Sequence, residues 1–177
     1  MFGNIICNLK QGDILKKKHS LIVIILVSVL VIAVGCAQPQ TPTPSDLDEV
    51  VITLERTPCF GACPEYQLTV YGNVTLVYEG KRFVRIEGKR TAIISEEKVR
   101  QLLSEFKEID YFSLNDSYEE FMATDMPSAF TSLTIDGKTK TVRHYHGDFS
   151  APKELTELEK KIDEIVNSNQ WIKSTLE

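Results

Sequence analysis

The sequence has few of the residues on which common catalytic motifs depend. Its 177 residues include three histidines, four cysteines and one tryptophan. It has no glycine-rich phosphate loop, no Gly-x-Ser-x-Gly turn and no His-Glu-x-x-His pair. No two carboxylates stand out by their spacing as an acid–base pair. The sequence therefore predicts no cofactor, and it favours a binding or structural module over an enzyme.

Basic residues are fewer than acidic ones, 20 against 25, which gives a formal net charge of −5. The first 36 residues are basic, so the remainder is more acidic than the whole chain. An acidic body argues against binding to nucleic acid or to anionic membrane surfaces. We expect a dispersed monomer with an unknown protein or small-molecule partner.

The N-terminal residues read as an export signal. Three lysines at 16–18 precede an apolar run at 21–34, which ends in Gly35 and Cys36. This pattern is typical of a secretory signal, and small residues before a cysteine resemble the lipobox of exported lipoproteins. We predict a signal peptide at 1–36, cleavage before Cys36 and lipidation of its sulfur, which would anchor the protein to the membrane.

An uncleaved anchor is the alternative reading of the same run, since residues 21–37 are just long enough to span a bilayer. Either reading places the rest of the chain outside the cytoplasm, in the cell envelope, because the lysines precede the apolar run. A proline-rich linker at 37–48 follows. Residues 49–172 are then expected to form a single domain.

Two cysteines lie outside the leader, in the stretch Pro58-Cys59-Phe60-Gly61-Ala62-Cys63-Pro64. Gly61 allows the chain to turn between Cys59 and Cys63, so a short disulfide loop is feasible. The two thiols could instead form a redox pair or bind a soft metal such as copper or zinc. An oxidising compartment favours a structural disulfide, and the spacing leaves the other two readings open.

Periodicity predicts the fold class. Alternating residues indicate strands at 50–55, 66–71, 74–78, 82–87, 130–135 and 138–145. Apolar residues at helical spacing follow Ser95, and a second such stripe follows Pro152. The order ββββ-α-ββ-α predicts an α+β domain with a single antiparallel sheet and two helices packed on one face.

Three further residues are candidates for function. His144 and His146 alternate along one strand and can present two imidazoles on one face, as in a metal pair. They could join Cys59 and Cys63 in a speculative metal site. The plainer reading is that one histidine packs by the core and the other lies at a solvated strand end. Asp125 lies in the long segment 110–128, which is a candidate functional loop, although aspartate is also common in turns.

The octapeptide Cys59-Phe60-Gly61-Ala62-Cys63-Pro64-Glu65-Tyr66 also carries a resemblance. With Thr124-Asp125-Met126-Pro127 and the strand that ends in His144-Tyr145, it resembles a family of uncharacterised domains found on envelope lipoproteins. A Cys-Phe-Gly-x-Cys-Pro-x-Tyr motif marks that family. The resemblance covers roughly residues 50–170. It implies a small secreted domain and no known activity.

Overall fold

A computed structural model describes residues 46–120 and 123–173 of the chain. These residues belong to one compact unit, Pro44–Glu177. The predicted signal, the lipidation site Cys36 and most of the predicted linker lie outside the described residues. No helix of the described part is long and apolar enough to cross a membrane.

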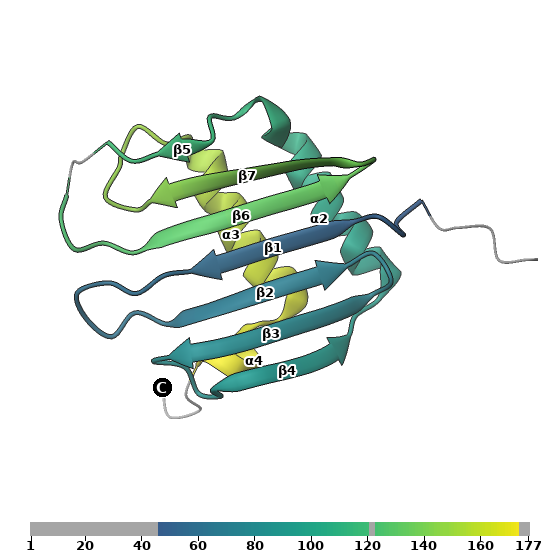
Figure 1. Ribbon diagram of the computed structural model, residues 1–177, viewed down its shortest axis with the longest axis horizontal. Helices are drawn as coiled ribbons and strands as arrows, with labels where there is room; N and C mark the ends of the chain where they lie inside the picture. The colour runs from purple at the N-terminus through teal and green to yellow at the C-terminus, as the bar shows by residue number, and fades with distance from the viewer. Residues whose placement is uncertain (1–45, 121–122, 174–177) are drawn as a thin grey trace, which may run out of the picture. The chain divides into compact units, whose positions relative to one another are not determined.

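A seven-stranded sheet forms one layer of the fold (Figure 1). The strands lie in the order β4-β3-β2-β1-β6-β7-β5. Neighbouring strands are antiparallel, except that β5 runs parallel to β7. The strands are β1 (Val51–Arg56), β2 (Glu65–Tyr71), β3 (Thr75–Arg82), β4 (Gly88–Ile93), β5 (Ser117–Tyr118), β6 (Ser128–Ile135) and β7 (Lys138–Tyr145).

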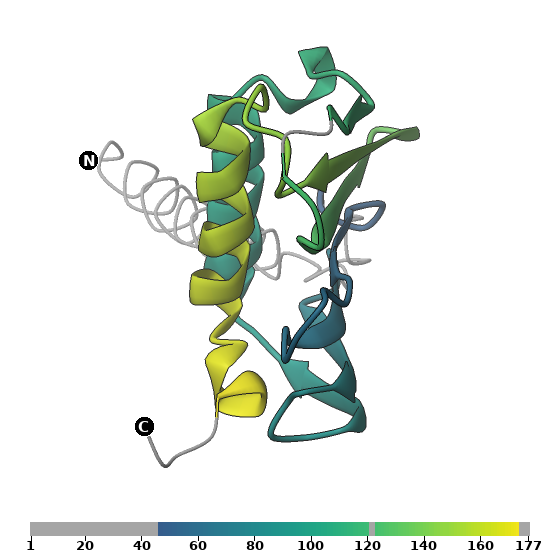
Figure 2. The ribbon, with the colours of Figure 1, turned by 90° about the vertical axis from the view of Figure 1, so that its left-hand side faces the viewer.

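Two helices, α2 (Glu96–Glu108) and α3 (Lys153–Val166), form the second layer on one face of the sheet (Figure 2). The Ser95 side chain accepts a hydrogen bond from the Lys98 amide and caps α2, as expected for serine at that position. Two short helical segments, η1 (Tyr111–Ser113) and α4 (Asn169–Ile172), complete the fold. The predicted α+β class is confirmed.

The core lies between the sheet and the helices. Alternate strand positions turn towards the helices, where they meet the apolar faces of α2 and α3. Leu47 is also buried, so the core begins two residues before the predicted domain start at 49. The largest fully buried side chains are Tyr78, Tyr111, Phe106, Leu47, Ile52, Leu54, Leu68, Leu76, Leu102, Leu155, Ile162 and Glu159.

The predicted strand at 82–87 is wrong. Strand β3 continues through Gly80 to Arg82, and β4 begins only at Gly88. Gly80 lies inside the strand, and only glycine fits there because a Cβ atom would come within 2.4 Å of the Tyr78 hydroxyl. Residues 83–87 form bends, and the Ile86 amide donates to the Trp171 carbonyl. A glycine between Glu79 and Lys81 resembles a turn in sequence, although here it serves close packing.

The prediction of a purely antiparallel sheet also needs correction, since the sheet is mixed. Strand β5 adds a parallel edge, where Ser117 pairs with Arg143 and Tyr118 with His144. A strand of two residues carries no periodic signal, so its sequence could not reveal it. Segment 110–128 is consequently not one structureless loop, because it contains η1, β5 and the buried Tyr111 and Tyr118.

The predicted two-residue hairpin between β6 and β7 is confirmed. Ile135 pairs with Lys138 across Asp136 and Gly137, which both have positive φ, 51° and 68°. The register then places Ala129 opposite His144, as the pattern predicted. This hairpin is what turns His144 and, two residues on, His146 towards α3.

Gly137→Val should lower the free energy of unfolding by more than about 1 kcal/mol, because a β-branched residue is strained at positive φ. Nothing lies within 4 Å of a Cβ at this position, so the cost is in the backbone alone. Urea unfolding monitored by circular dichroism measures it. The exposed Thr141→Val in the same hairpin is the control, with an expected change under about 0.5 kcal/mol. Equal stability of the two variants would contradict the turn assignment.

Candidate functional site

Three loops meet at the end of the sheet where β1 ends and β2 begins, on the left in Figure 1. We call this region, residues 57–64, 123–127 and 147–151, the loop end. Backbone hydrogen bonds join the three loops. The Phe60 amide donates to the Asp125 carbonyl, and the Ala123 amide donates to the Gly147 carbonyl, both at 3.1 Å. The loops therefore form one continuous surface.

Cys59 and Cys63 form the predicted disulfide within the first of these loops, with their Cα atoms 5.7 Å apart. Both sulfurs are therefore used by the bridge. Strand β2 begins at Glu65, directly after the bridge, so no helix N-terminus lies beside Cys63 to lower a thiol pKa. This arrangement favours the structural reading of the pair over the redox reading.

The disulfide should contribute about 2 kcal/mol to stability, as expected for so short a closed loop. Replacing both Cys59 and Cys63 with serine should lower the free energy of unfolding by that amount and leave the fold intact. Urea unfolding measures the loss, and wild-type protein treated with reductant should show the same value. A double variant that fails to fold would show instead that the bridge is essential to the domain.

Asp125, the candidate loop residue, occupies a turn. Its φ is 66°, in the left-handed region that aspartate tolerates better than most residues. Its carbonyl accepts the Phe60 amide, and its carboxylate accepts the Thr124 hydroxyl at 3.1 Å. The side chain is exposed, and among the described residues it makes no hydrogen bond to another titratable group. Asp125 therefore shapes the loop end.

Beneath the loop end, Glu159 of α3 holds both histidines. His144 Nδ1 donates to one carboxylate oxygen at 2.7 Å, and His146 Nε2 donates to the other at 2.8 Å. Glu159 and His144 are buried, whereas the His146 side chain is 24% exposed. The carboxylate thus bridges two imidazoles from the end of β7.

Arg56, the last residue of β1, extends this cluster. Its guanidinium lies 3.4 Å from Glu159 and donates to the Asp163 carboxylate at 2.9 Å. Asp163 follows Glu159 by one helical turn and also accepts the Tyr66 hydroxyl at 2.8 Å. These six side chains, which we call the polar network, connect β1, β2 and β7 to α3. They are Arg56, Tyr66, His144, His146, Glu159 and Asp163.

The polar network fixes the charges of Glu159 and Arg56. Burial alone would raise the pKa of Glu159, but the hydrogen bonds from His144 and His146 and the charge of Arg56 outweigh it. The pKa of Glu159 falls from 4.5 to about 2. Burial lowers the pKa of Arg56. The surrounding Tyr66, Asp163 and Glu159 raise the pKa by more than burial lowers it, so the net shift is upward. At neutral pH Glu159 is an anion and Arg56 a cation.

A family model described as a domain of unknown function (DUF6438) matches residues 50–166, about two thirds of the chain. The chain belongs to this family. The DUF6438 span covers all seven strands and helices α2 and α3, and it contains the whole polar network. Membership confirms the expectation of an uncharacterised domain. No curated protein matches the chain.

Within the DUF6438 domain, the speculative metal set is not assembled as predicted. Among the described residues, one group of metal-binding side chains comes together, and it consists of His144, His146 and Glu159 without either cysteine. The histidine pair was thus placed correctly on one face, but both histidines point to the core side. His144 packs by the core, as the plainer reading expected, and His146 lies just past the end of β7 with its side chain 24% exposed but bonded to Glu159.

Sequence reasoning missed Glu159, Asp163 and Arg56. Glu159 lies four residues after Leu155 and three before Ile162, in the middle of the apolar stripe of α3. Arg56 continues the inward alternation of Ile52 and Leu54. A charged residue at an apolar position of its element was the available signal in both cases.

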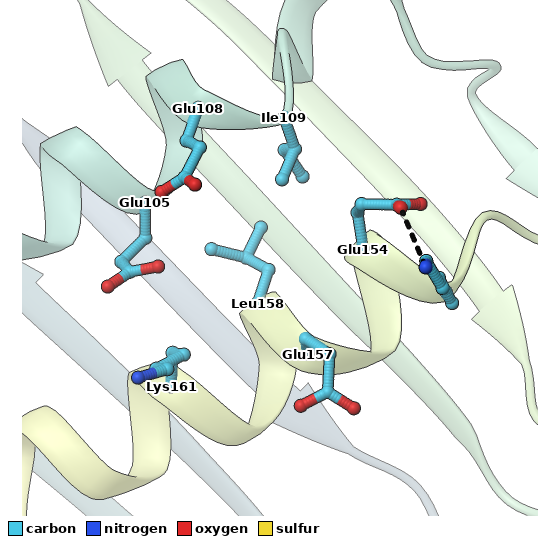
Figure 3. A pocket seen from close by; sticks show the side chains of 8 residues that line it. Glu105, Glu108, Ile109, Glu154, Glu157, Leu158 and Lys161 are labelled. Atoms are coloured by element: carbon cyan, nitrogen blue, oxygen red, sulfur yellow. Dashed lines mark ion pairs between the residues drawn. The ribbon is translucent and has the colours of Figure 1, made fainter.

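A surface groove between α2 and α3 offers no comparable centre. Figure 3 shows Glu105 and Glu108 projecting from α2 and Glu157 from α3, with Leu158 between the two helices. An ion pair joins Lys153 and Glu154 at one end, at 3.9 Å. The charged side chains are long and solvated, so we interpret the groove as the outer surface of a helix pair. The polar network and the loop end above it remain the candidate site.

Proposed function

We propose that this DUF6438 protein is a lipid-anchored, extracytoplasmic binding module, and that it contacts a protein of the cell envelope through the loop end. The observation that carries the proposal is Phe60. Its side chain is 89% exposed at the tip of the disulfide loop. A phenylalanine left in water forgoes about 2 kcal/mol of burial energy, which a partner with an apolar socket would recover. Aromatic side chains of this kind are enriched at interfaces.

The rigidity of the loop end supports the proposal. The disulfide closes the Phe60 loop, and Phe60 itself is tied to Asp125 through its amide. Three hydrogen bonds join Thr57 to Ser128: the Thr57 amide and hydroxyl donate to the Ser128 carbonyl at 2.9 and 3.1 Å, and the Ser128 amide donates to the Thr57 hydroxyl at 2.8 Å. A surface that is already ordered loses little conformational entropy when a partner binds.

Neighbouring loops add apolar area. Met126 is 44% exposed and follows Asp125, the residue bonded to Phe60. Phe149 is 71% exposed on the third loop. Asp148, beside it, accepts the amides of Glu120 and Ser150 and holds that loop in place. Exposed apolar side chains on ordered loops are characteristic of interaction surfaces.

The lipid anchor rests on the residues before the domain, where three lysines precede an apolar run that ends in Gly35-Cys36. The full chain should incorporate a labelled fatty acid in cells that process lipoproteins. Cys36→Ser should remove the label, whereas Cys7→Ser should keep it, because Cys7 lies in the residues that are cleaved off. A mature protein that retains residues 1–35 would contradict cleavage and favour the uncleaved anchor.

Photo-crosslinking tests the binding surface. A photoreactive phenylalanine analogue in place of Phe60 should give a discrete adduct with an envelope protein when cells are irradiated. The matched control carries the analogue at Ile93, which is 72% exposed at the end of β4. Ile93 pairs with Thr75 at the opposite end of the strands, so it should give no such adduct.

Competition sharpens the result. Excess Phe60→Ala protein should fail to compete for the adduct, whereas excess Ile93→Ala protein should compete as the wild type does. Adducts of equal yield from both positions, or adducts with lipid alone at position 60, would overturn the proposal.

A further inference from the structure

The imidazoles of His144 and His146 and the carboxylate of Glu159 lie close together. One ligand atom from each residue lies within 4.8 Å of the others, and the two imidazole rings are 4.6 Å apart. Going beyond the proposed function, we propose that these three residues bind a divalent transition-metal ion of the zinc class. The ligands would be Nδ1 of His144, Nε2 of His146 and a carboxylate oxygen of Glu159.

The ligand types select the metal. Two imidazoles and one carboxylate suit Zn(II), Cu(II), Ni(II) and Co(II). Calcium and magnesium prefer oxygen ligands, whereas two of the three ligands here are imidazole nitrogens. Three protein ligands leave a fourth tetrahedral position for water, as in zinc sites with two histidines and one glutamate. The site would therefore hold a metal with an open coordination position.

The surrounding charges permit a dication. Arg56 lies 3.4 Å from Glu159 and would repel a metal ion if it were unpaired. Asp163 accepts the same guanidinium at 2.9 Å and offsets its charge. Glu159 then retains its negative charge for the metal. The Asp163–Arg56 pair thereby holds the Glu159 side chain as an outer-shell partner would.

Small movements convert the present arrangement into a metal site. Each imidazole now donates a proton to Glu159 across 2.7 or 2.8 Å. Ligands of a tetrahedral zinc ion at about 2.0–2.1 Å lie about 3.3 Å apart. Each nitrogen therefore moves about half an ångström away from its own carboxylate oxygen, and ligand atoms that now lie up to 4.8 Å apart approach one another. The imidazole protons move to the other ring nitrogens, Nε2 of His144 and Nδ1 of His146. Neither nitrogen has a protein hydrogen-bond partner among the described residues.

The metal can reach the site from solvent. His146 is 24% exposed, Arg56 20% and Asp163 15%, whereas Glu159 and His144 are buried. The open side of the cluster is thus lined by His146. This residue can rotate towards an incoming ion, while Glu159 and His144 need to separate by only about half an ångström.

Titration of the chelator-treated full chain with Co(II) tests the proposal, because tetrahedral cobalt gives visible absorption bands. We expect one ion per chain and displacement of cobalt by Zn(II). His146→Gln should weaken binding by more than about tenfold, since it removes a ligand. Glu157→Gln, an exposed carboxylate on the same helix, is the matched control and should leave the affinity unchanged.

A readout on the wild type keeps the test valid if His146→Gln does not fold. His144 and His146 are the only histidines after residue 19, so their ring signals in NMR report on this site. Zinc should shift both sets of signals and raise the melting temperature. Absence of stoichiometric binding, or binding that leaves both histidine signals unmoved, would overturn the proposal and leave the cluster a purely structural network.

Discussion

Glu159→Ala should lower the free energy of unfolding by about 3–5 kcal/mol, the largest effect that we expect from a single polar substitution in this domain. Glu159 is 1% exposed and accepts His144, His146 and Arg56. Its removal leaves two imidazole donors without their acceptor, takes one of two carboxylate partners from Arg56, and opens a cavity under β7. These consequences destabilise the folded state.

Urea unfolding at neutral pH measures the loss. Glu157→Ala is the control, because Glu157 lies on the exposed face of the same helix and should cost less than about 0.5 kcal/mol. Glu159→Gln should fall between the two, since it keeps the shape but can no longer accept from both histidines and pair with Arg56 as an anion. A loss below about 1 kcal/mol for Glu159→Ala would contradict the polar network.

Acid should destabilise the wild type more than Glu159→Gln. The pKa of Glu159 is lowered from 4.5 to about 2 in the folded protein. Ionised Glu159 therefore contributes stability that is fully present above pH 4.5 and is lost as the pH falls towards 2. A shift of this size corresponds to about 3 kcal/mol. His144, His146 and Arg56 face Glu159 and sustain the shift.

Urea unfolding at pH 6, 4.5, 3.5 and 2.5 follows this loss. The free energy of unfolding should fall in both proteins, because other carboxylates also titrate. The fall should be steeper in the wild type, and the difference between the two proteins should shrink as the pH decreases. Parallel curves across this range would mean that the Glu159 carboxylate gains nothing from its neighbours.

Local chemistry made part of the fold predictable. Asp136-Gly137 needs positive φ at both positions, and few residues allow it, so the β6–β7 hairpin and its register followed from the sequence. The Cys59–Cys63 bridge followed from the spacing and the inferred compartment. The apolar stripes of α2 and α3 likewise predicted the helices and the face that each buries.

Long-range contacts decided the remainder. Gly80 resembles a turn residue until the Tyr78 ring and the Ile86 carbonyl are seen to occupy the space of its side chain. Strand β5 forms where Tyr118 is buried beside β7. No local sequence pattern predicts this contact. Glu159 was not singled out because its partners, Arg56 and the two histidines, are distant in sequence.

The position of two protons tests the central claim, which is that Glu159 joins both histidines beneath the loop end. An ionised carboxylate can only accept, so in the metal-free protein the proton must lie on Nδ1 of His144 and on Nε2 of His146. Nitrogen-15 NMR of the imidazoles in chelator-treated protein observes this directly, with His19→Gln removing the third histidine. We predict protonated signals from these two nitrogens at neutral pH. An unprotonated Nδ1 of His144 or Nε2 of His146 would contradict the network.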